Sequence, residues 1–364
     1  MRLRSVILLL AAVAIGLTAY FYTSNNKFKS VLTSVDLIPS LQGNLNSVTK
    51  FTVLEAGNLL LSSVSKTESG WIVDNRDGYE ANVAAVRNVF ENLAEAKLAE
   101  AKTSNPQNYT KLGVESIENE NAQGVLLTVD GLGDTVNIIF GNDGSSGKNT
   151  QYVRHQKEQQ SWLINKKINI ARDPTDWLEK DILDIPPERI KNITIQHADG
   201  TVIDINNTGN QAYEFVIDAI APDGMKISDS QIYQVANALS SLQLTDVSKA
   251  ELLRADDLAP SVTTVFKTFD GLTITTRAYP GPVVKLNFMI DIDFNAAHVD
   301  ENIENKTPEA ESTIDAAMIS DPKAAESLSK SLKQKLDGWA YVLPTISQAA
   351  LTKKLTDFFI DKDA

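Results

Sequence analysis

The chain has 364 residues, enough for two domains of ordinary size, and its 43% hydrophobic and 22% charged residues are typical of a globular protein. Its net charge is −13, but residues 1–30 hold four basic side chains and no acid, so the rest of the chain carries −17. Such an acidic body repels phosphate backbones, which excludes nucleic acid as an expected partner, and the lack of cysteine excludes disulfides and thiolate metal sites.

The N-terminal segment, residues 1–25, predicts a signal anchor that forms a single transmembrane helix. Two arginines precede residues 6–22, an apolar stretch of about 17 residues that is near the lower limit for a membrane-spanning helix. Three aromatic residues at 20–22 fit an interfacial belt, and the arginines favour a cytoplasmic N-terminus. A cleaved signal peptide is the alternative, and it also exports the body. Residues 26–44 are expected to be a linker.

Two stretches of the body share one pattern of apolar residues. Each contains an amphipathic helix with a 3-4-3 spacing, and the second copy follows the first by 149 residues. Strand residues before the helices correspond at a distance of 142 residues, as Phe51 and Ile193 do. The two expected helix faces are Val83, Val86, Phe90 and Leu93, and Ile232, Val235, Leu239 and Leu242.

The pattern predicts an α+β protein made of two tandem repeats of a β-β-β-α-β-β-β-β unit. Each copy has a hairpin with an Asp-Gly turn, at 130–131 and at 270–271. We expect the first unit at 45–172, a connector helix at 173–188, and the second unit at 189–364. A helical insertion at about 295–336 and a final helix at 347–359 complete the second unit. Ser228 and Gln231 predict a capping box for its first helix.

Few residue patterns point to chemistry. Acidic residues gather near 291–304, where oxygen ligands could bind calcium weakly, although a solvated loop explains them as well. No histidine pair has a zinc-site spacing, and no G-x-S-x-G elbow marks a nucleophile, so we expect no catalytic residue, metal or cofactor. The weak calcium candidates are Asp291, Asp293, Asp300 and Glu301, and the final helix offers Leu351, Leu355, Phe358 and Phe359 for partner docking.

Four stretches carry a resemblance to a known family: "GWIV" at 70–73, "YTKLGV" at 109–114, "QYVRH" at 151–155 and "DWLEKDILDIPPERIKNITI" at 176–195. With them the chain resembles, over most of residues 45–290, a bacterial family known as domain of unknown function 4340. The resemblance implies a single-anchor protein of the inner membrane with a periplasmic body. It also implies genes beside ABC transporter components of the gliding-motility type.

The resulting hypothesis is a non-enzymatic accessory or scaffold protein of an ABC-type transporter assembly, with inner-membrane transporter subunits as partners. Two alternatives stay open. One is a module that binds an envelope lipid or glycan in an apolar cavity. The other is a hydrolase of envelope polymers that uses Asp291 or Asp293 with His298, which requires these groups to converge in a cleft.

Overall fold

The computed structural model describes residues 35–144, 149–208, 214–254, 258–281, 285–299 and 322–362. The expected membrane anchor at 6–22 lies outside the described residues, and within them no helix is long and apolar enough to cross a membrane. The chain forms two compact units. The first holds the described residues up to Asn75 together with Val83–Trp177, and the second holds Arg76–Asn82 and the chain from Leu178 onward.

The first unit is built on nine antiparallel strands in the order β1-β6-β10-β9-β8-β7-β2-β3-β4. The helices of this unit are α2 (Val83–Glu95) and the short α3 (Tyr109–Leu112). The strands are β1 (Val35–Asp36), β2 (Lys50–Glu55), β3 (Leu59–Thr67), β4 (Gly70–Val73), β6 (Lys97–Ala101), β7 (Val125–Asp130), β8 (Val136–Asp143), β9 (Gln151–His155) and β10 (Ser161–Ile164). Strand β5 (Tyr79–Glu80) lies in the segment Arg76–Asn82 of the second unit.

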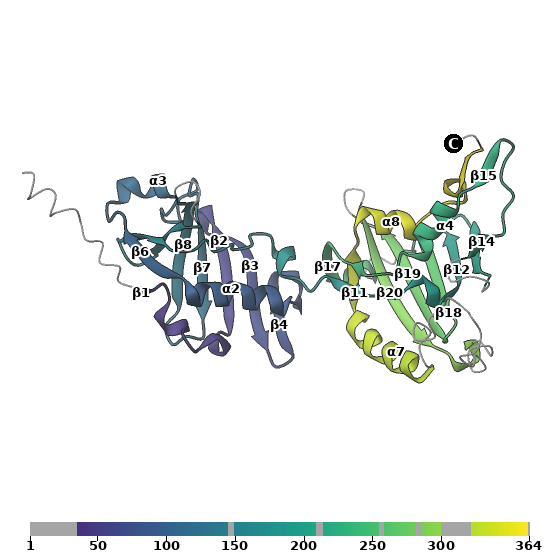
Figure 1. Cartoon of the computed structure of the whole chain (residues 1–364), viewed down its shortest axis with the longest axis horizontal. Coiled ribbons are helices and arrows are strands. Elements are labelled where there is room, and N and C mark those ends of the chain that lie inside the picture. The colour runs from purple at the N-terminus through teal and green to yellow at the C-terminus, as the bar shows by residue number, and fades with distance from the viewer. Residues whose placement is uncertain are drawn as a thin grey trace, which may run out of the picture. The chain divides into compact units, whose positions relative to one another are not determined.

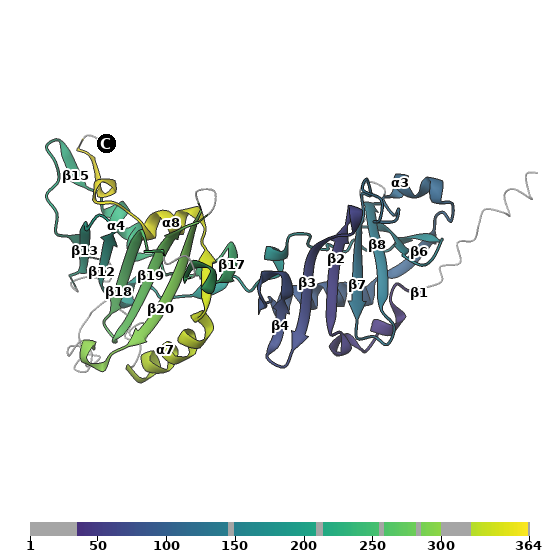
Figure 2. The same cartoon turned by 180° about the vertical axis from the view of Figure 1, so that it is seen from behind.

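Helix α2 crosses one face of this sheet, over β2, β3 and β7 (Figure 1), and Figure 2 shows the same strands from the other side. Three residues of the predicted 3-4-3 face, Val86, Phe90 and Leu93, are buried, whereas the fourth, Val83, is 44% exposed at the start of the helix. Phe90 meets Phe51 of β2 edge to face with ring centroids 5.4 Å apart. Trp177 meets the same ring at 4.9 Å. Burial of this aromatic group holds the helix on the sheet.

The second unit is built on an eight-stranded sheet in the order β14-β13-β12-β18-β19-β20-β21-β17. Two small sheets pair β11 with β16 and β15 with β22. The helices are α4 (Asp229–Ala236), α5 (Glu251–Arg254), α7 (Pro322–Leu336) and α8 (Thr345–Leu351). The strands are β11 (Asp181–Leu183), β12 (Ile190–His197), β13 (Val202–Asn207), β14 (Phe215–Ile217), β15 (Met225–Ile227), β16 (Leu242–Gln243), β17 (Asp246–Lys249), β18 (Val262–Thr268), β19 (Leu272–Pro280), β20 (Leu286–Phe294), β21 (Trp339–Val342) and β22 (Phe359–Asp361).

The fold class is α+β with antiparallel sheets, as predicted. The first sheet, read from β4, runs β4-β3-β2-β7-β8-β9-β10-β6, and the second runs β14-β13-β12-β18-β19-β20-β21-β17. Along the chain, the strands of the two units also fill these positions in the same succession: β2, β3 and β4 come first in one order, and β12, β13 and β14 take the same positions in the other. Phe51 and Ile193, for example, lie in β2 and β12, which take the same place.

The strand order that the two units share has eight strands, one more than the seven of the predicted pattern. The extra strands are β6 and β17, which come directly after the amphipathic helix region. The sequence of β6, "KLAEA", consists mostly of good helix formers, so it reads as a continuation of α2. Pairing with β1 and β10 on its two sides makes it a strand instead.

Other predicted boundaries were wrong. The connector is a 3₁₀ turn at Pro174–Trp177 followed by β11, not a helix. The final helix ends at Leu351, and the chain then forms a 3₁₀ turn (Leu355–Phe358) and β22, because β15 offers an edge for pairing. The expected linker is packed from residue 35 onward, where Leu37, Ile38 and Leu41 are buried.

The second amphipathic helix is also shorter than predicted. Helix α4 ends at Ala236, and Leu242 lies in β16, although Leu239 and Leu242 are both buried as the apolar pattern requires. Ser228 is the N-cap residue, but its hydroxyl contacts Ser230 at 2.9 Å and makes no capping hydrogen bond.

Asp74 directly follows β4 and forms hydrogen bonds with side chains of β2 and β3. Its Oδ2 accepts hydrogen bonds from Ser63 Oγ at 2.6 Å, Ser65 Oγ at 2.7 Å and Lys50 Nζ at 3.0 Å. Burial alone would raise the pKa of Asp74, but these hydrogen bonds and the charge of Lys50 lower it below its ordinary value. The ionised carboxylate therefore stabilises the folded state above the ordinary aspartate pKa, and this contribution is lost as the pH falls through the lowered pKa.

Replacing Asp74 by asparagine is expected to lower the free energy of unfolding by about 1 kcal/mol at pH 7, since the site is partly exposed. The difference from wild type should shrink as the pH falls below about 4, the ordinary aspartate pKa. Urea unfolding at pH 7 and pH 3 measures both. Asp134→Asn, at an exposed position between β7 and β8, is the control, and an equal loss in both variants would contradict the role of Asp74.

Candidate functional site

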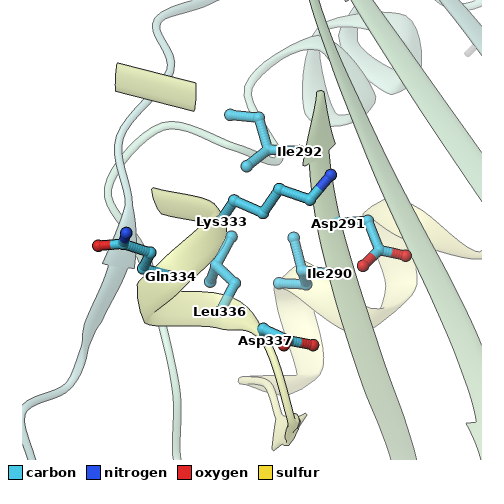
Figure 3. Close-up of a pocket in the computed structure, with 7 residues that line it drawn as sticks. All are labelled: Ile290, Asp291, Ile292, Lys333, Gln334, Leu336 and Asp337. Atoms are coloured by element: carbon cyan, nitrogen blue, oxygen red, sulfur yellow. The ribbon is translucent and has the colours of Figure 1, made fainter. Parts of the chain in front are cut away.

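Two of the four residues that the sequence offered as calcium ligands, Asp291 and Asp293, lie on β20, and Asp291 lines a pocket of about 430 Å³. The pocket lies between β20 and the end of α7, and Figure 3 shows the Lys333 side chain extending from α7 toward the strand. The buried residues Ile290, Ile292 and Leu336 form its apolar part. Lys333, Asp291, Gln334 and Asp337 complete the lining, so the pocket presents both charges beside its apolar part.

Each β20 aspartate already has a cationic partner. Asp291 pairs with Arg277 of β19, and Asp293 accepts a hydrogen bond from Lys333 Nζ at 2.6 Å. The hydrogen bond to Asp293 and the charge of that carboxylate raise the pKa of Lys333. Surface pairs of this kind contribute little to stability, but they occupy the oxygens that a calcium ion would need.

The other calcium candidates, Asp300 and Glu301, lie outside the described residues. Across the described ranges, no three acidic or histidine side chains come together as a possible metal site. His298, in the 3₁₀ turn Ala296–His298, has its Nε2 3.4 Å from the Asn295 amide nitrogen. The hydrolase hypothesis therefore rests on two aspartates that are engaged in ion pairs.

The four residues expected to dock a partner lie in the C-terminal segment, and the structure separates them. Leu351 and Phe358 are 1% and 0% exposed, so they belong to the interior of the second unit. Phe359 is half-buried in β22. Leu355 is also half-buried, and it lines a second pocket of about 520 Å³. Docking stays a prediction for the two half-buried residues, because the buried pair offers no surface.

The pocket beside Leu355 is formed by strands at the end of the eight-stranded sheet. Its lining contains Val202 and Asp204 of β13, and Asp218 and Ile220 in the turn after β14. Asp204 accepts a hydrogen bond from Thr194 Oγ1 at 2.8 Å. The remaining described lining residues are Asn192, Ile203, Asn206, Ile217 and Ala219, so the described lining has two carboxylates and no basic side chain.

The stretches that carry the family resemblance contain the two most buried arginines described. Arg154 of β9 is 5% exposed and donates hydrogen bonds to the backbone oxygens of Val114, Gln156 and Glu158 at 2.8–3.0 Å. Its guanidinium lies 4.6 Å from the centre of the Tyr109 ring. Burial lowers the pKa of Arg154, against the opposing effects of Tyr109 and Glu115. This cluster fixes the loop around α3.

Arg189 follows the paired prolines of the connector and forms a buried ion pair. Its Nη2 and Nε lie 2.6 Å and 3.1 Å from Oδ2 of Asp270, which also accepts a hydrogen bond from Thr268. The sequence predicted Asp270 as a turn residue, but not its pairing with Arg189. Arg189 directly precedes β12, and Asp270 lies in the turn between β18, which pairs with β12, and β19.

A comparison with protein-family models identifies one family. The model described as "Domain of unknown function (DUF4340)" matches residues 71–261. The chain belongs to the DUF4340 family. The match begins in β4 and ends just before β18, so it contains α2, α4, Arg154 and Arg189. Neither the curated proteins nor the solved structures include a significant match to this DUF4340 chain.

Proposed function

We propose that this DUF4340 protein is a non-catalytic binding protein, an accessory or scaffold subunit of an ABC-type transporter assembly. In this proposal residues 6–22 anchor it in the bacterial inner membrane and its body lies in the periplasm. The observation that carries the binding role is the pocket beside Leu355, where Val202 is 51% and Ile220 is 96% exposed. Large apolar side chains gathered at a pocket are typical of an interaction site.

The ion pairs on β20 support the same choice over catalysis. A carboxylate that works as a general base or nucleophile needs to be free to accept a proton or to attack. Asp291 and Asp293 are instead paired with Arg277 and Lys333. These ion pairs connect β20 with β19 and with α7.

The shared strand order supports a tandem origin of the two units. We propose that they are duplicated copies, which would give one anchored chain two similar sheets for contact. Tethering to the membrane raises the effective concentration of both near a membrane partner. The transporter as partner follows from the family's expected gene neighbourhood.

Affinity purification from crosslinked native membranes tests the proposal. The full-length chain is expected to recover subunits of an ATP-driven transporter, identified by mass spectrometry. A chain that lacks residues 1–34 is the control, and it should recover fewer of these subunits because it has lost the tether. Recovery of the full-length chain alone, without a stable membrane partner, would contradict the proposal.

A further inference from the structure

Strand β14 ends the eight-stranded sheet and, among the described strands, pairs with β13 alone (Figure 1). Its register pairs Phe215, Val216 and Ile217 with Asn207, Asn206 and Ile205. In an antiparallel pair, alternate residues direct their backbone N–H and C=O groups away from the partner strand. The C=O of Ile217 accepts a hydrogen bond from Ala219 N–H at 3.0 Å, and the remaining outward groups of β14 are those to which a further strand can bind.

The residues of β14 do not protect this edge. Natural edge strands are shielded by short length, lysine, proline, bulges or inward-pointing charges, which prevent unwanted pairing. Strand β14 is short, with three residues, but its sequence Phe-Val-Ile has no charged residue and no proline. Phe215 and Ile217 point into the core, and Val216 on the other face is 46% exposed. An edge of this kind favours strand addition.

Exposed apolar side chains continue from the edge into the adjoining pocket. Val202 is the first residue of β13, and Ile220 lies three residues after the end of β14. Both line the pocket beside Leu355. Val216 is a third exposed aliphatic residue, on β14 itself. A segment paired with β14 would place alternate side chains on the face of Val216, because successive residues of a strand face opposite sides.

The charge around the pocket selects the kind of segment. Asp204 and Asp218 line it, and no lysine or arginine is among its described lining residues. The body of the chain is strongly acidic as well. Complementary charge at the rim of an interface favours a basic partner and raises its association rate.

We propose that the edge of β14 and its pocket, the β14 site, bind an extended basic segment of a partner protein, which adds as a strand. Main-chain hydrogen bonds supply affinity, and apolar and basic side chains at alternate positions supply specificity. This inference rests on the proposed function, because it identifies where and how the accessory subunit would hold its partner.

The probe is a fluorescent, end-capped nine-residue peptide of alternating lysine and valine, titrated into the full-length chain in detergent and followed by anisotropy. A peptide of alternating glutamate and valine should bind at least about tenfold more weakly, as like charges repel. Two versions of the lysine peptide, N-methylated at alternate residues, cannot donate all the hydrogen bonds of a strand. The version methylated on the pairing side should lose binding. Equal binding of both versions and the parent peptide would overturn the proposal, since only charge would then hold the peptide.

The double substitution Val202→Ser and Ile220→Ser removes apolar surface from two exposed positions. It should weaken peptide binding by about tenfold or more, equivalent to about 1.4 kcal/mol. The control is Leu59→Ser, because Leu59 is 58% exposed on β3 of the other sheet, and its affinity should stay within about twofold of wild type. Hydrogen exchange should show peptide-induced protection at 214–220. Wild-type affinity in the double variant, or protection only elsewhere, would overturn the β14 site.

The experiments distinguish a failure of the accessory-subunit proposal from a failure of the β14-site proposal. If transporter subunits copurify but the peptide does not bind, the β14 site is wrong and the accessory role stands. If the peptide binds as described but no membrane partner is recovered, the site stands and the accessory role is wrong.

Discussion

Replacing Arg189 by methionine is expected to lower the free energy of unfolding by about 3–5 kcal/mol, the usual cost of leaving one buried charge without its partner. The side chains of Arg189 and Asp270 are 7% and 1% exposed. Without the guanidinium, Asp270 keeps a hydrogen bond from Thr268 but no opposite charge. Urea unfolding followed by tryptophan fluorescence, with calorimetry to separate the transitions of the two units, measures the loss.

The surface pair of Arg277 and Asp291 supplies a matched control. These side chains are 35% and 49% exposed, so Arg277→Met should cost less than about 1 kcal/mol. Adding Asp270→Leu to Arg189→Met should restore part of the loss, because it removes the uncompensated charge. A loss for Arg189→Met no larger than that for Arg277→Met would show that the buried pair does not stabilise the unit. Should Arg189→Met not fold, Arg189→Lys tests the pair with its charge retained.

The features that the sequence predicted correctly are those set by short-range patterns. The 3-4-3 spacing from Val83 to Leu93 predicted α2, because an amphipathic face is periodic within one helix. The Asp-Gly turns predicted both hairpins, and Gly131 and Gly271 have φ values of +98° and +92°, which suit glycine.

The features that it missed depend on pairing between distant segments. Strand β22 exists because β15 pairs with it from far along the chain, so its residues read locally as the end of a helix. Asp291 and Asp293 were recognised as an acidic group, but their partners Arg277 and Lys333 come from another strand and a helix. Local spacing carries no information about such contacts.

The β14 site could not be predicted for a different reason. Sequence patterns assign apolar residues in strands to the core. The sequence of a single strand does not indicate whether that strand lies at the centre or at the edge of a sheet. Val216 alternates with the buried Phe215 and Ile217, so it occupies the face that a polar residue would usually take. Only the strand order shows that β14 has a neighbouring strand on one side alone in the described sheet.

Replacing Arg154 by methionine is expected to cost the first unit about 3–4 kcal/mol, because three backbone oxygens, one buried and two partly buried, lose their charged donor. The oxygens belong to Val114 and to two residues of the turn between β9 and β10, so one side chain fixes two loops. Loss of the contact with the Tyr109 ring adds to the effect. Unfolding by urea measures the stability, and hydrogen exchange of the two loops measures their opening.

Replacing Arg154 by lysine separates the effect of the positive charge on stability from the effect of the shape of the side chain. Its ammonium keeps the positive charge, but it lacks the planar fork with which arginine donates in several fixed directions. Arg154→Lys should therefore still lose about 1–3 kcal/mol. Arg172→Met is the control, since Arg172 is 54% exposed and its loss should stay below about 1 kcal/mol. If lysine restored full stability, charge alone would explain the site. A loss with lysine, together with faster exchange in both loops, would establish that the fork of Arg154 holds them together.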